Sequence, residues 1–314
     1  MNRRDFLKGA ALAGTAILAN KAAFAAEQAA TPAAPAPSIL PGNVPLVTLP
    51  NGRMIPQLGF GTLWLKEKSV ASVRMAAERG YRLFDTAQGY GNEKEIWQGI
   101  REAGLVRSEV FITTKISTDN MRKPPQKACI ERSIEALGGE YIDLMLIHWP
   151  VRDHIRETWE TLEDFVRQGT IRSIGLSNFN PHHIDDLLAY AQVRPVLNQI
   201  EIHPYHSQEA NIAAIRKYGL VVNSWSPLAQ GKVLSEAALA NIGKKHNKTP
   251  AQVTLRWAVQ RGLVVIPRSQ NPAHISENFD IFNFSLDDAD MTAIAALNRN
   301  ERVNPKNDPD NFPW

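Results

Sequence analysis

Two side chains that can exchange protons stand five residues apart in the stretch 80–93. A largely apolar run at residues 81–84 ends at Asp85, and Tyr90 follows between two glycines. Such a run is typical of a buried strand, and the flanking glycines indicate a loop. A carboxylate at a strand end beside a loop phenol suits acid–base chemistry. An aspartate that caps the next helix, together with an ordinary loop tyrosine, explains the same residues equally well.

Other apolar runs are followed by polar or aromatic side chains in the same way. In a barrel of alternating strands and helices, the C-terminal ends of the strands meet at one rim, where such enzymes carry their active sites. Each residue also has a structural interpretation: Lys115 as a solvated strand end, His148 as a core histidine, and Gln199 as an amide lining the barrel. A structural origin for all of them together is less plausible, which favours a functional site at this rim. The remaining groups at strand ends are Ser177, Asn178, Trp225, Arg268 and Ser269.

Eight apolar runs, each followed by a helix-compatible segment, predict the elements that position these side chains. Successive runs are spaced by about 20–40 residues, the length of a βα unit. Asn180-Pro181 and Thr249-Pro250 mark the beginnings of two of the helices. We therefore expect an α/β fold, a (β/α)8 TIM barrel, with strands at residues 57–61, 81–85, 110–114, 142–148, 171–176, 196–200, 220–225 and 263–267.

A short hairpin precedes the barrel. Residues 46–49 and 53–55 flank Pro50-Asn51-Gly52, and Asn-Gly is typical of a tight hairpin turn. We expect this N-terminal β-hairpin to close the bottom of the barrel. No second domain is needed, so residues 46–314 are predicted to form one barrel domain.

The composition is that of an ordinary globular protein, with 44% hydrophobic and 21% charged residues. Four basic residues and one acidic residue within the first 25 account for the whole formal charge of +3. The remainder is neutral overall, which gives no case for binding nucleic acid. The single cysteine, Cys129, excludes an internal disulfide and fits a small buried residue better than a nucleophile.

The N-terminus resembles the signal read by the bacterial twin-arginine export machinery. Arg3-Arg4 stands before Phe6-Leu7-Lys8, and a small, apolar stretch follows at residues 9–26. Polar interruptions in that stretch argue against a permanent membrane span, and Ala23-Phe24-Ala25 offers a cleavage site. We expect a signal peptide at residues 1–25, an Ala/Pro-rich linker at 26–45 and a periplasmic mature protein; a cytoplasmic protein with an amphipathic N-terminus is the weaker alternative. Twin-arginine export carries folded proteins, which suits a chain that holds a cytoplasmic cofactor.

From residue 46 to the C-terminus the chain resembles the aldo-keto reductase family, which are nicotinamide-dependent barrel enzymes. The resemblance rests on six motifs in order: GYRLFDTA at 80–87 with GNE at 91–93, ITTK at 112–115, LIHWP at 146–150, GLSNF at 175–179, NQIE at 198–201 and IPRS at 266–269. A further stretch, SWSPLAQG at 224–231, is similar to the bacterial 2,5-diketo-gluconate reductase branch.

The resemblance implies a catalytic tetrad of Asp85, Tyr90, Lys115 and His148. Reduction of a carbonyl leaves negative charge on oxygen, and a phenol can both hydrogen bond to that oxygen and protonate it. Free tyrosine has a pKa of about 10, so a neighbouring ammonium from Lys115 would ease proton loss. Asp85 would hold the lysine, and His148 would orient the carbonyl beside Tyr90. The division of labour between Tyr90 and His148 stays open at this point.

The resemblance also implies the residues that hold the cofactor. Ser177, Asn178 and Gln199 are similar to those that bind the nicotinamide carboxamide, and Trp225 stands where an aromatic ring stacks on the nicotinamide. No G-x-G-x-x-G occurs, so a Rossmann domain is not the source of nicotinamide binding. No metal is required, and residues 203–206 are interpreted as a loop with ordinary polar contacts. The other expected contacts are Gly61 and Thr62, Ser226 and Leu228 near the pyrophosphate, Arg268, Ser269 and His274 at the 2′-phosphate, and Glu277 and Asn278 at the adenine.

One departure bears on cofactor choice. The family usually holds the 2′-phosphate with a Lys-Ser pair and a later arginine, whereas this chain has Arg268-Ser269 and then His274. A guanidinium keeps its charge, but an imidazole is mostly neutral at pH 7. We expect NADP(H) as cofactor, with reduced discrimination against NAD(H).

Two functions follow from the resemblance. The first is NADPH-dependent reduction of aldehydes or ketones, such as small ketoaldehydes, keto sugars or keto acids. The second is an exported nicotinamide-binding redox sensor or partner subunit with little turnover, because no free NADPH pool is expected outside the cytoplasm. We expect a monomer that binds a small carbonyl substrate, with selectivity set by segments 117–123 and 304–314.

Overall fold

The computed structural model describes residues 40–123 and 126–312. The expected signal peptide at 1–25 lies outside the described residues, as do most of the expected linker and the last two residues of the tail. Among residues 40–123 and 126–312, none of the helices combines the length and the apolar character that a membrane span requires.

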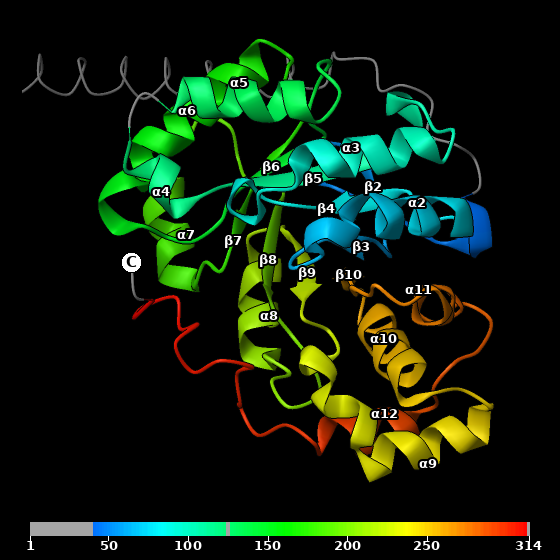
Figure 1. The fold of residues 1–314 in the computed structure, drawn as a ribbon. Helices are drawn as coiled ribbons and strands as arrows, with labels where there is room; N and C mark the ends of the chain where they lie inside the picture. Colours follow the sequence, from blue (N-terminus) through cyan, green and yellow to red (C-terminus); the bar gives the residue numbers. More distant parts are fainter. Residues whose placement is uncertain (1–39, 124–125, 313–314) are drawn as a thin grey trace, which may run out of the picture.

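Eight parallel strands form one sheet, in which each strand pairs with its neighbours in sequence order (Figure 1). The first and last strands also meet, because Val265 N–H donates to Gln57 O at 2.9 Å and Gly59 N–H donates to Val265 O at 2.8 Å. The sheet therefore closes, and the predicted (β/α)8 barrel is confirmed. The strands are β3 (Phe60–Gly61), β4 (Leu83–Asp85), β5 (Phe111–Ile116), β6 (Leu144–Ile147), β7 (Ile174–Ser177), β8 (Leu197–Glu201), β9 (Val221–Trp225) and β10 (Val264–Val265).

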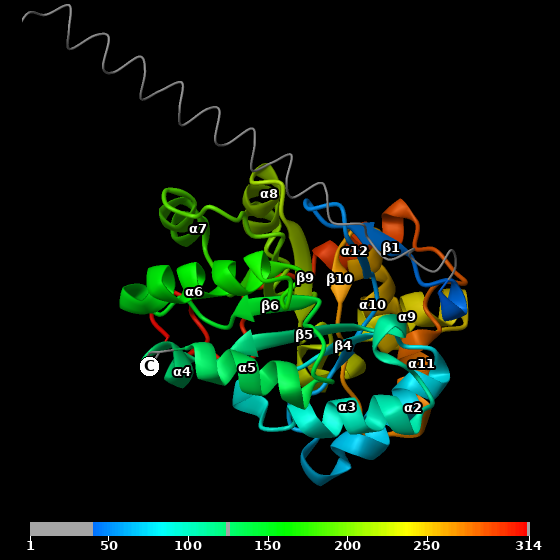
Figure 2. The same cartoon turned by 90° about the horizontal axis from the view of Figure 1, so that it is seen from above.

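Helices encircle the strands (Figure 2). They are α2 (Ser69–Arg79), α3 (Glu93–Glu102), α4 (Thr118–Met121), α5 (Lys127–Ala136), α6 (Ile155–Arg167), α7 (Pro181–Leu188), α8 (Glu209–Lys217), α9 (Ala237–His246), α10 (Pro250–Gln260), α11 (Pro272–Phe279) and α12 (Asp288–Ala295). Short 3-10 segments are η1 (Pro41–Asn43), η2 (Lys66–Lys68), η3 (Gln88–Tyr90), η4 (Arg107–Glu109), η5 (Arg152–His154) and η6 (Ala229–Ser235). The two predicted helix beginnings are confirmed: each of α7 and α10 has its proline in the first turn and a capping residue, Asn180 or Thr249, before it.

The inward-facing side chains of the strands change from apolar at the bottom of the barrel to polar at the rim formed by the C-terminal strand ends. On β4 the inward side chains are Leu83 and then Asp85, and on β8 they are Leu197 and then Gln199. The apolar member of each pair packs in a buried cluster at the bottom, which leaves the polar member at the top. The barrel interior is thus apolar at the bottom and polar at the rim. Each rim side chain lies on a strand whose lower residues are tightly packed.

The hairpin β1 (Leu46–Thr48) and β2 (Met54–Pro56) closes the bottom, as predicted. Leu49 and Ile55 from this hairpin are buried in the same inner cluster as Leu83 and Leu197. Gly52 takes a φ of 81°, which is the left-handed conformation that the turn requires.

The folded part begins before residue 46. Leu40 and Val44 are buried in the main core, and Gly42 lies so close to Phe279 that an added Cβ would stand 2.3 Å from the ring. The last residues of the expected 26–45 linker are therefore part of the packed domain. No apolar periodicity marks them, because η1 is only three residues long.

Cys129 is buried in α5, and burial raises the pKa of its thiol. The thiol is therefore protonated near neutral pH and a weak nucleophile, in keeping with the structural interpretation of this residue.

Candidate active site

A cavity of about 530 Å³ opens at the C-terminal ends of the strands. This volume is within the range of ordinary ligand sites. Three members of the predicted tetrad line it, and the fourth, Lys115, lies behind them in the barrel. The cavity is also lined by all thirteen residues predicted to hold the cofactor, namely Gly61, Thr62, Ser177, Asn178, Gln199, Trp225, Ser226, Leu228, Arg268, Ser269, His274, Glu277 and Asn278. The structure thus brings these residues together, and their individual roles stay predictions.

A buried ion pair forms the floor of the cavity. Lys115 Nζ donates to Asp85 Oδ1 at 2.5 Å and to Thr86 O at 2.9 Å. Lys115 is completely buried and Asp85 is 2% exposed. Burial opposes the charge on Lys115, but Asp85 and Tyr90 outweigh it, so the pKa of the lysine is raised. Lys115 is consequently a fixed ammonium in the barrel interior.

Tyr90 stands above this ammonium. It ends η3, and Gly91 allows the chain to turn back with a φ of 68°. Lys115 Nζ lies 5.1 Å from the centre of the Tyr90 ring. Burial raises the pKa of Tyr90, while the charge of Lys115 lowers it in part. The phenol is therefore protonated at neutral pH, and the adjacent ammonium stabilises the phenolate that proton loss would leave.

His148 packs edge-on against Tyr90, with ring centres 5.7 Å apart and planes 73° apart. Burial and the charge of Lys115 lower the pKa of His148 to about 3. The imidazole is therefore neutral near pH 7, so it can donate a hydrogen bond to a bound oxygen but holds no extra proton to transfer. The two groups whose roles the sequence left open therefore differ in the proton that each can offer at neutral pH.

Amide and indole groups occupy the neighbouring strand ends. Trp225 Nε1 donates to Asn178 Oδ1 at 2.8 Å, and Asn178 Nδ2 donates to His148 O at 3.0 Å. Asn178 has a φ of 63°, a left-handed conformation that asparagine tolerates better than most residues. Gln199 Nε2 donates to Asp85 Oδ2 at 2.7 Å, which leaves its carbonyl oxygen as the part that can accept from a ligand. The hydrogen bond to Asn178 holds the indole of Trp225 in one orientation.

The far end of the cavity is suited to a phosphate. Arg268 follows β10, is exposed, and forms no ion pair or hydrogen bond with any other described residue. Ser269 and His274 flank the N-terminus of α11, where Asn271 Oδ1 caps the N–H of Ala273 at 2.9 Å. An uncommitted guanidinium beside a helix N-terminus is a favourable setting for an anion. The residues present therefore fit a phosphorylated cofactor.

Sequence reasoning missed several residues that line the cavity. Trp149, beside His148, and Leu234 are two of them, while Trp64, whose place in the pocket the sequence left open, also lines it and is 56% exposed. Phe312 stacks on Trp149 with ring centres 3.9 Å apart, and Asn307 lies nearby in the tail. Segment 304–314 thus reaches the pocket through these two residues, while its role in selectivity stays a prediction; positions 313–314 lie outside the described part.

None of the described residues of segment 117–123 lines the cavity, so the structure gives no support to the expectation that this segment sets selectivity. Met121 of α4 is buried in the core instead. Ser117 N–H and Asn120 Nδ2 both donate to Gln88 Oε1, at 3.1 and 2.8 Å. The segment therefore supports the Tyr90 loop from behind.

The described residues hold one three-residue group with metal-ligand spacing, His182, His183 and Asp310, and it lies outside the cavity. His183 Nδ1 accepts the N–H of Asn180 at 3.1 Å. In the neutral ring the hydrogen then resides on Nε2, the atom that faces Asp310 at 3.4 Å. This arrangement fits a hydrogen bond better than a metal ligand. His203 is likewise engaged, 2.9 Å from Glu201, in the loop at 203–206.

A closed (β/α)8 barrel with a buried Asp–Lys pair beneath a cavity phenol is an arrangement that suits acid–base chemistry. The model of the Aldo/keto reductase family matches residues 57–299. The chain belongs to the aldo/keto reductase family.

Characterised proteins with similar sequences are consistent with membership of this family. The chain is 43% identical over 264 residues to a glyoxal reductase from Bacillus subtilis, covering 83% of this chain and 96% of the relative. It is 42% identical over 276 residues to a 9,11-endoperoxide prostaglandin H2 reductase from Trypanosoma cruzi, with coverage of 86% and 96%. It is 40% identical over 276 residues to a methylglyoxal reductase from Escherichia coli K12, with coverage of 86% and 98%.

Solved structures agree as well. An aldo/keto reductase from Brucella melitensis superposes with a TM-score of 0.78 at 40% identity, covering 81% of this chain and 99% of that one. An aldo-keto reductase from Bombyx mori, solved in complex with NADP, superposes with a TM-score of 0.78 at 34% identity, with coverage of 86% and 99%.

Proposed function

We propose that the protein reduces aldehydes or ketones to alcohols with NADPH, and that Tyr90 is the proton donor. The single observation that carries this proposal is the buried Lys115 ammonium, fixed by Asp85 beneath the phenol. A protonated phenol with a permanent cation beneath it can give up its proton to a developing alkoxide at neutral pH.

The bound nicotinamide would supply the hydride to the carbonyl carbon. Asn178 and Gln199 would orient it through their amides, and Trp225 would offer its ring for stacking. Neutral His148 donates a hydrogen bond to the carbonyl oxygen and so places that oxygen beside Tyr90. Tyr90 transfers its proton to the oxygen, Lys115 stabilises the phenolate left behind, and Asp85 keeps Lys115 in position.

We propose NADP(H) as the preferred cofactor, with measurable use of NAD(H). Arg268 supports the preference because its guanidinium has no described partner, and the Bombyx mori relative was solved with NADP. His274 offers less charge than an arginine would, which limits discrimination. Comparison of kcat/KM for the two cofactors tests this, and equal or better efficiency with NADH would contradict it.

For the substrate we propose small ketoaldehydes, keto sugars or keto acids, in line with the 2,5-diketo-gluconate branch. The glyoxal and methylglyoxal reductases among the relatives support small dicarbonyls. NADPH oxidation by the purified chain with methylglyoxal and with diketo-gluconate is the direct test. Turnover of either supports a reductase, whereas tightly bound cofactor with no turnover of any carbonyl would favour a redox sensor.

We also propose that the chain is exported to the periplasm by the twin-arginine route. The support is the sequence of residues 1–25, whose paired arginines precede a small apolar stretch. Fractionation of cells that express the full chain should place the mature protein in the periplasm. Replacing Arg3 and Arg4 together with lysine should retain it in the cytoplasm, and export of that variant at the wild-type level would overturn the proposal.

A further inference from the structure

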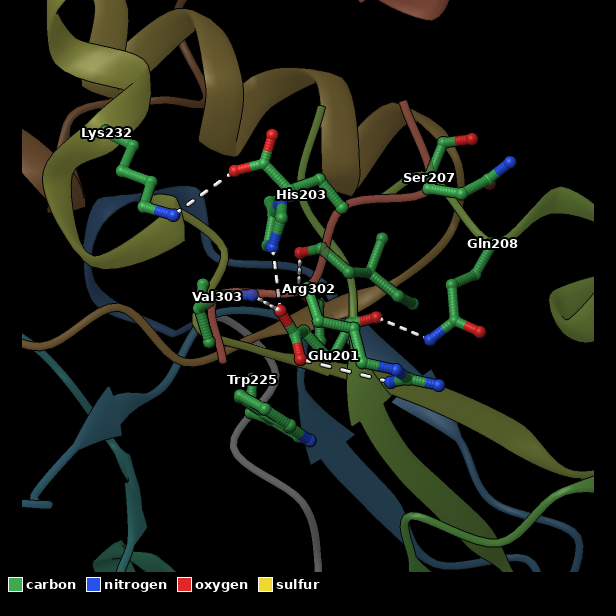
Figure 3. Close-up of polar contacts among 12 residues, drawn as sticks. Glu201, His203, Ser207, Gln208, Trp225, Lys232, Arg302 and Val303 are labelled. Carbon is green, nitrogen blue, oxygen red and sulfur yellow. Dashed lines mark hydrogen bonds and ion pairs between the residues drawn. The ribbon is translucent and has the colours of Figure 1, made fainter. Parts of the chain in front are cut away.

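Glu201 ends β8 with a buried carboxylate that the proposed chemistry does not use. Its Oε1 accepts the backbone N–H of Val303 at 2.5 Å and lies 2.9 Å from His203 Nε2 (Figure 3). Its Oε2 receives no hydrogen bond from any described residue and lies 4.0 Å from the guanidinium of Arg302. A buried charge is retained only where donors compensate its loss of hydration, and here two of the three partners are the adjacent residues Arg302 and Val303.

Those two residues belong to the tail, the segment 298–312, which follows α12 and runs past α8 to α7 (Figure 1). The tail first docks on the loop after β8, where the N–H groups of Arg299 and Glu301 both donate to Tyr205 O, at 3.1 and 3.0 Å. Val303 N–H thus bonds to the barrel, whereas the N–H groups of residues 306, 307, 310 and 311 bond within the tail itself. Beyond it the chain crosses the edge of the cavity, which Asn307 and Phe312 line. Glu201 is therefore the attachment point from which the cavity-lining part of the tail departs.

Two kinds of contact hold the far end of the tail: Phe312 stacks on the buried Trp149 with ring centres 3.9 Å apart, and Asp310 makes polar contacts that are more exposed. Asp310, 44% exposed, accepts from Asn180 Nδ2 at 2.9 Å and lies 3.1 Å from His182 Nε2. Exposed pairs of this kind contribute little because water and salt screen them. The charge-assisted bond to a fully buried carboxylate is the stronger restraint. Glu201 therefore fixes the point from which the cavity-lining part of the tail begins, and the stacking of Phe312 on Trp149 holds its other end.

We propose that Glu201 is a positioning residue for the substrate side of the cavity. Its carboxylate fixes where the tail leaves the barrel, and thereby sets the placement of Asn307 and Phe312 against the substrate. Glu201 does not line the cavity, so it acts only through the tail. The consequence is selectivity among carbonyls by size, with little effect on cofactor binding. The substrate part of this inference rests on the proposed reductase function, whereas the structural part does not.

The first test is hydrogen–deuterium exchange of Glu201→Gln. Glutamine keeps the size of the side chain but removes its charge, so the bond to Val303 weakens. We expect exchange across residues 299–312 to accelerate about tenfold, the scale of losing a hydrogen bond to a charged group. Glu163→Gln is the matched control, because Glu163 is also buried and accepts backbone N–H groups, from Gln192 at 2.7 Å and Val193 at 2.9 Å, far from the cavity lining. That control should leave exchange of the tail unchanged.

Val303→Pro tests the same bond from the other side, since it removes the N–H donor and leaves the buried carboxylate intact. Val303→Pro therefore still tests the bond if Glu201→Gln fails to fold. In both variants KM for a bulky aromatic aldehyde should rise about tenfold, the scale of losing one methylene-sized contact, while KM for methylglyoxal and the affinity for NADPH change much less. Wild-type exchange of the tail in both variants would overturn the inference, as would equal changes in KM for the two carbonyls. If the wild type reduces no carbonyl, the proposed function fails, and the exchange measurement still decides the role of Glu201.

Discussion

Gln199 donates a hydrogen bond of 2.7 Å to Asp85, on the carboxylate oxygen opposite the one that accepts from Lys115. One carboxylate therefore holds both a residue expected to bind the nicotinamide and the lysine beneath the proposed acid. Gln199→Leu should remove the first bond and lower the free energy of unfolding by about 2 kcal/mol, because it involves a charged acceptor. It should also weaken NADPH binding, since the amide carbonyl is lost. Urea denaturation and a fluorescence titration with NADPH measure these effects, and a variant unchanged in both would contradict this arrangement.

Lys115→Met should remove most of the activity and also destabilise the fold. Loss of the ammonium leaves Asp85 buried without its ion-pair partner, which costs about 3–5 kcal/mol. The double variant Lys115→Met/Asp85→Asn should recover much of that stability but none of the activity. Activity in the double variant near the wild-type level would mean that the ammonium does not assist Tyr90.

His148 makes stability depend on pH in a defined direction. Its pKa is lowered from 6.5 to about 3 in the folded state, by burial first and by Lys115 second. Between those values the unfolded chain binds more protons than the folded one, so stability is lost as the pH falls through this window. His148→Gln should have a shallower pH dependence than the wild type. Urea denaturation at pH 7 and pH 4.5 checks this, and parallel losses in both proteins would rule out His148 as the cause.

Arg268→Ala should lower kcat/KM for NADPH by about tenfold or more while leaving the value for NADH nearly unchanged, because only the former carries the phosphate that the guanidinium would pair with. His274→Ala should have a smaller effect in the same direction. Equal losses with both cofactors would place Arg268 away from the 2′-phosphate. The ratio of the two kcat/KM values is the quantity to measure.

The barrel and the convergence of its polar rim were predictable from sequence, because strand alternation is a local signal. Leu83 and Asp85 on β4 show why: a period of two places an apolar residue at the bottom and a polar one at the top of the same face. Neutral His148 was not predictable, since its lowered pKa depends on burial and on Lys115, which lies on another strand. The position of segment 117–123 away from the cavity lining was not predictable either. It depends on hydrogen bonds to Gln88, which only tertiary packing brings within reach.

The anchor at Glu201 marks the limit of local reasoning most clearly. Alternation places Glu201 on the same face as Gln199, so its inward direction could be read from the strand. Its partner, the N–H of Val303, lies 102 residues further along the chain. Every residue except proline has a main-chain N–H, so no sequence motif predicts that Val303 bonds to Glu201.

The central claim is that Tyr90 gives its proton to the substrate, with Lys115 beneath it. Tyr90→Phe removes only the hydroxyl, and the phenyl ring still fits against His148. The most direct measurement is single-turnover reduction of methylglyoxal by NADPH-loaded wild type and Tyr90→Phe, with NADPH affinity determined in parallel. We predict unchanged NADPH affinity and a rate of reduction lower by about 10²–10⁴-fold in the variant, the usual contribution of a positioned acid. Reduction by Tyr90→Phe at the wild-type rate would contradict the assignment.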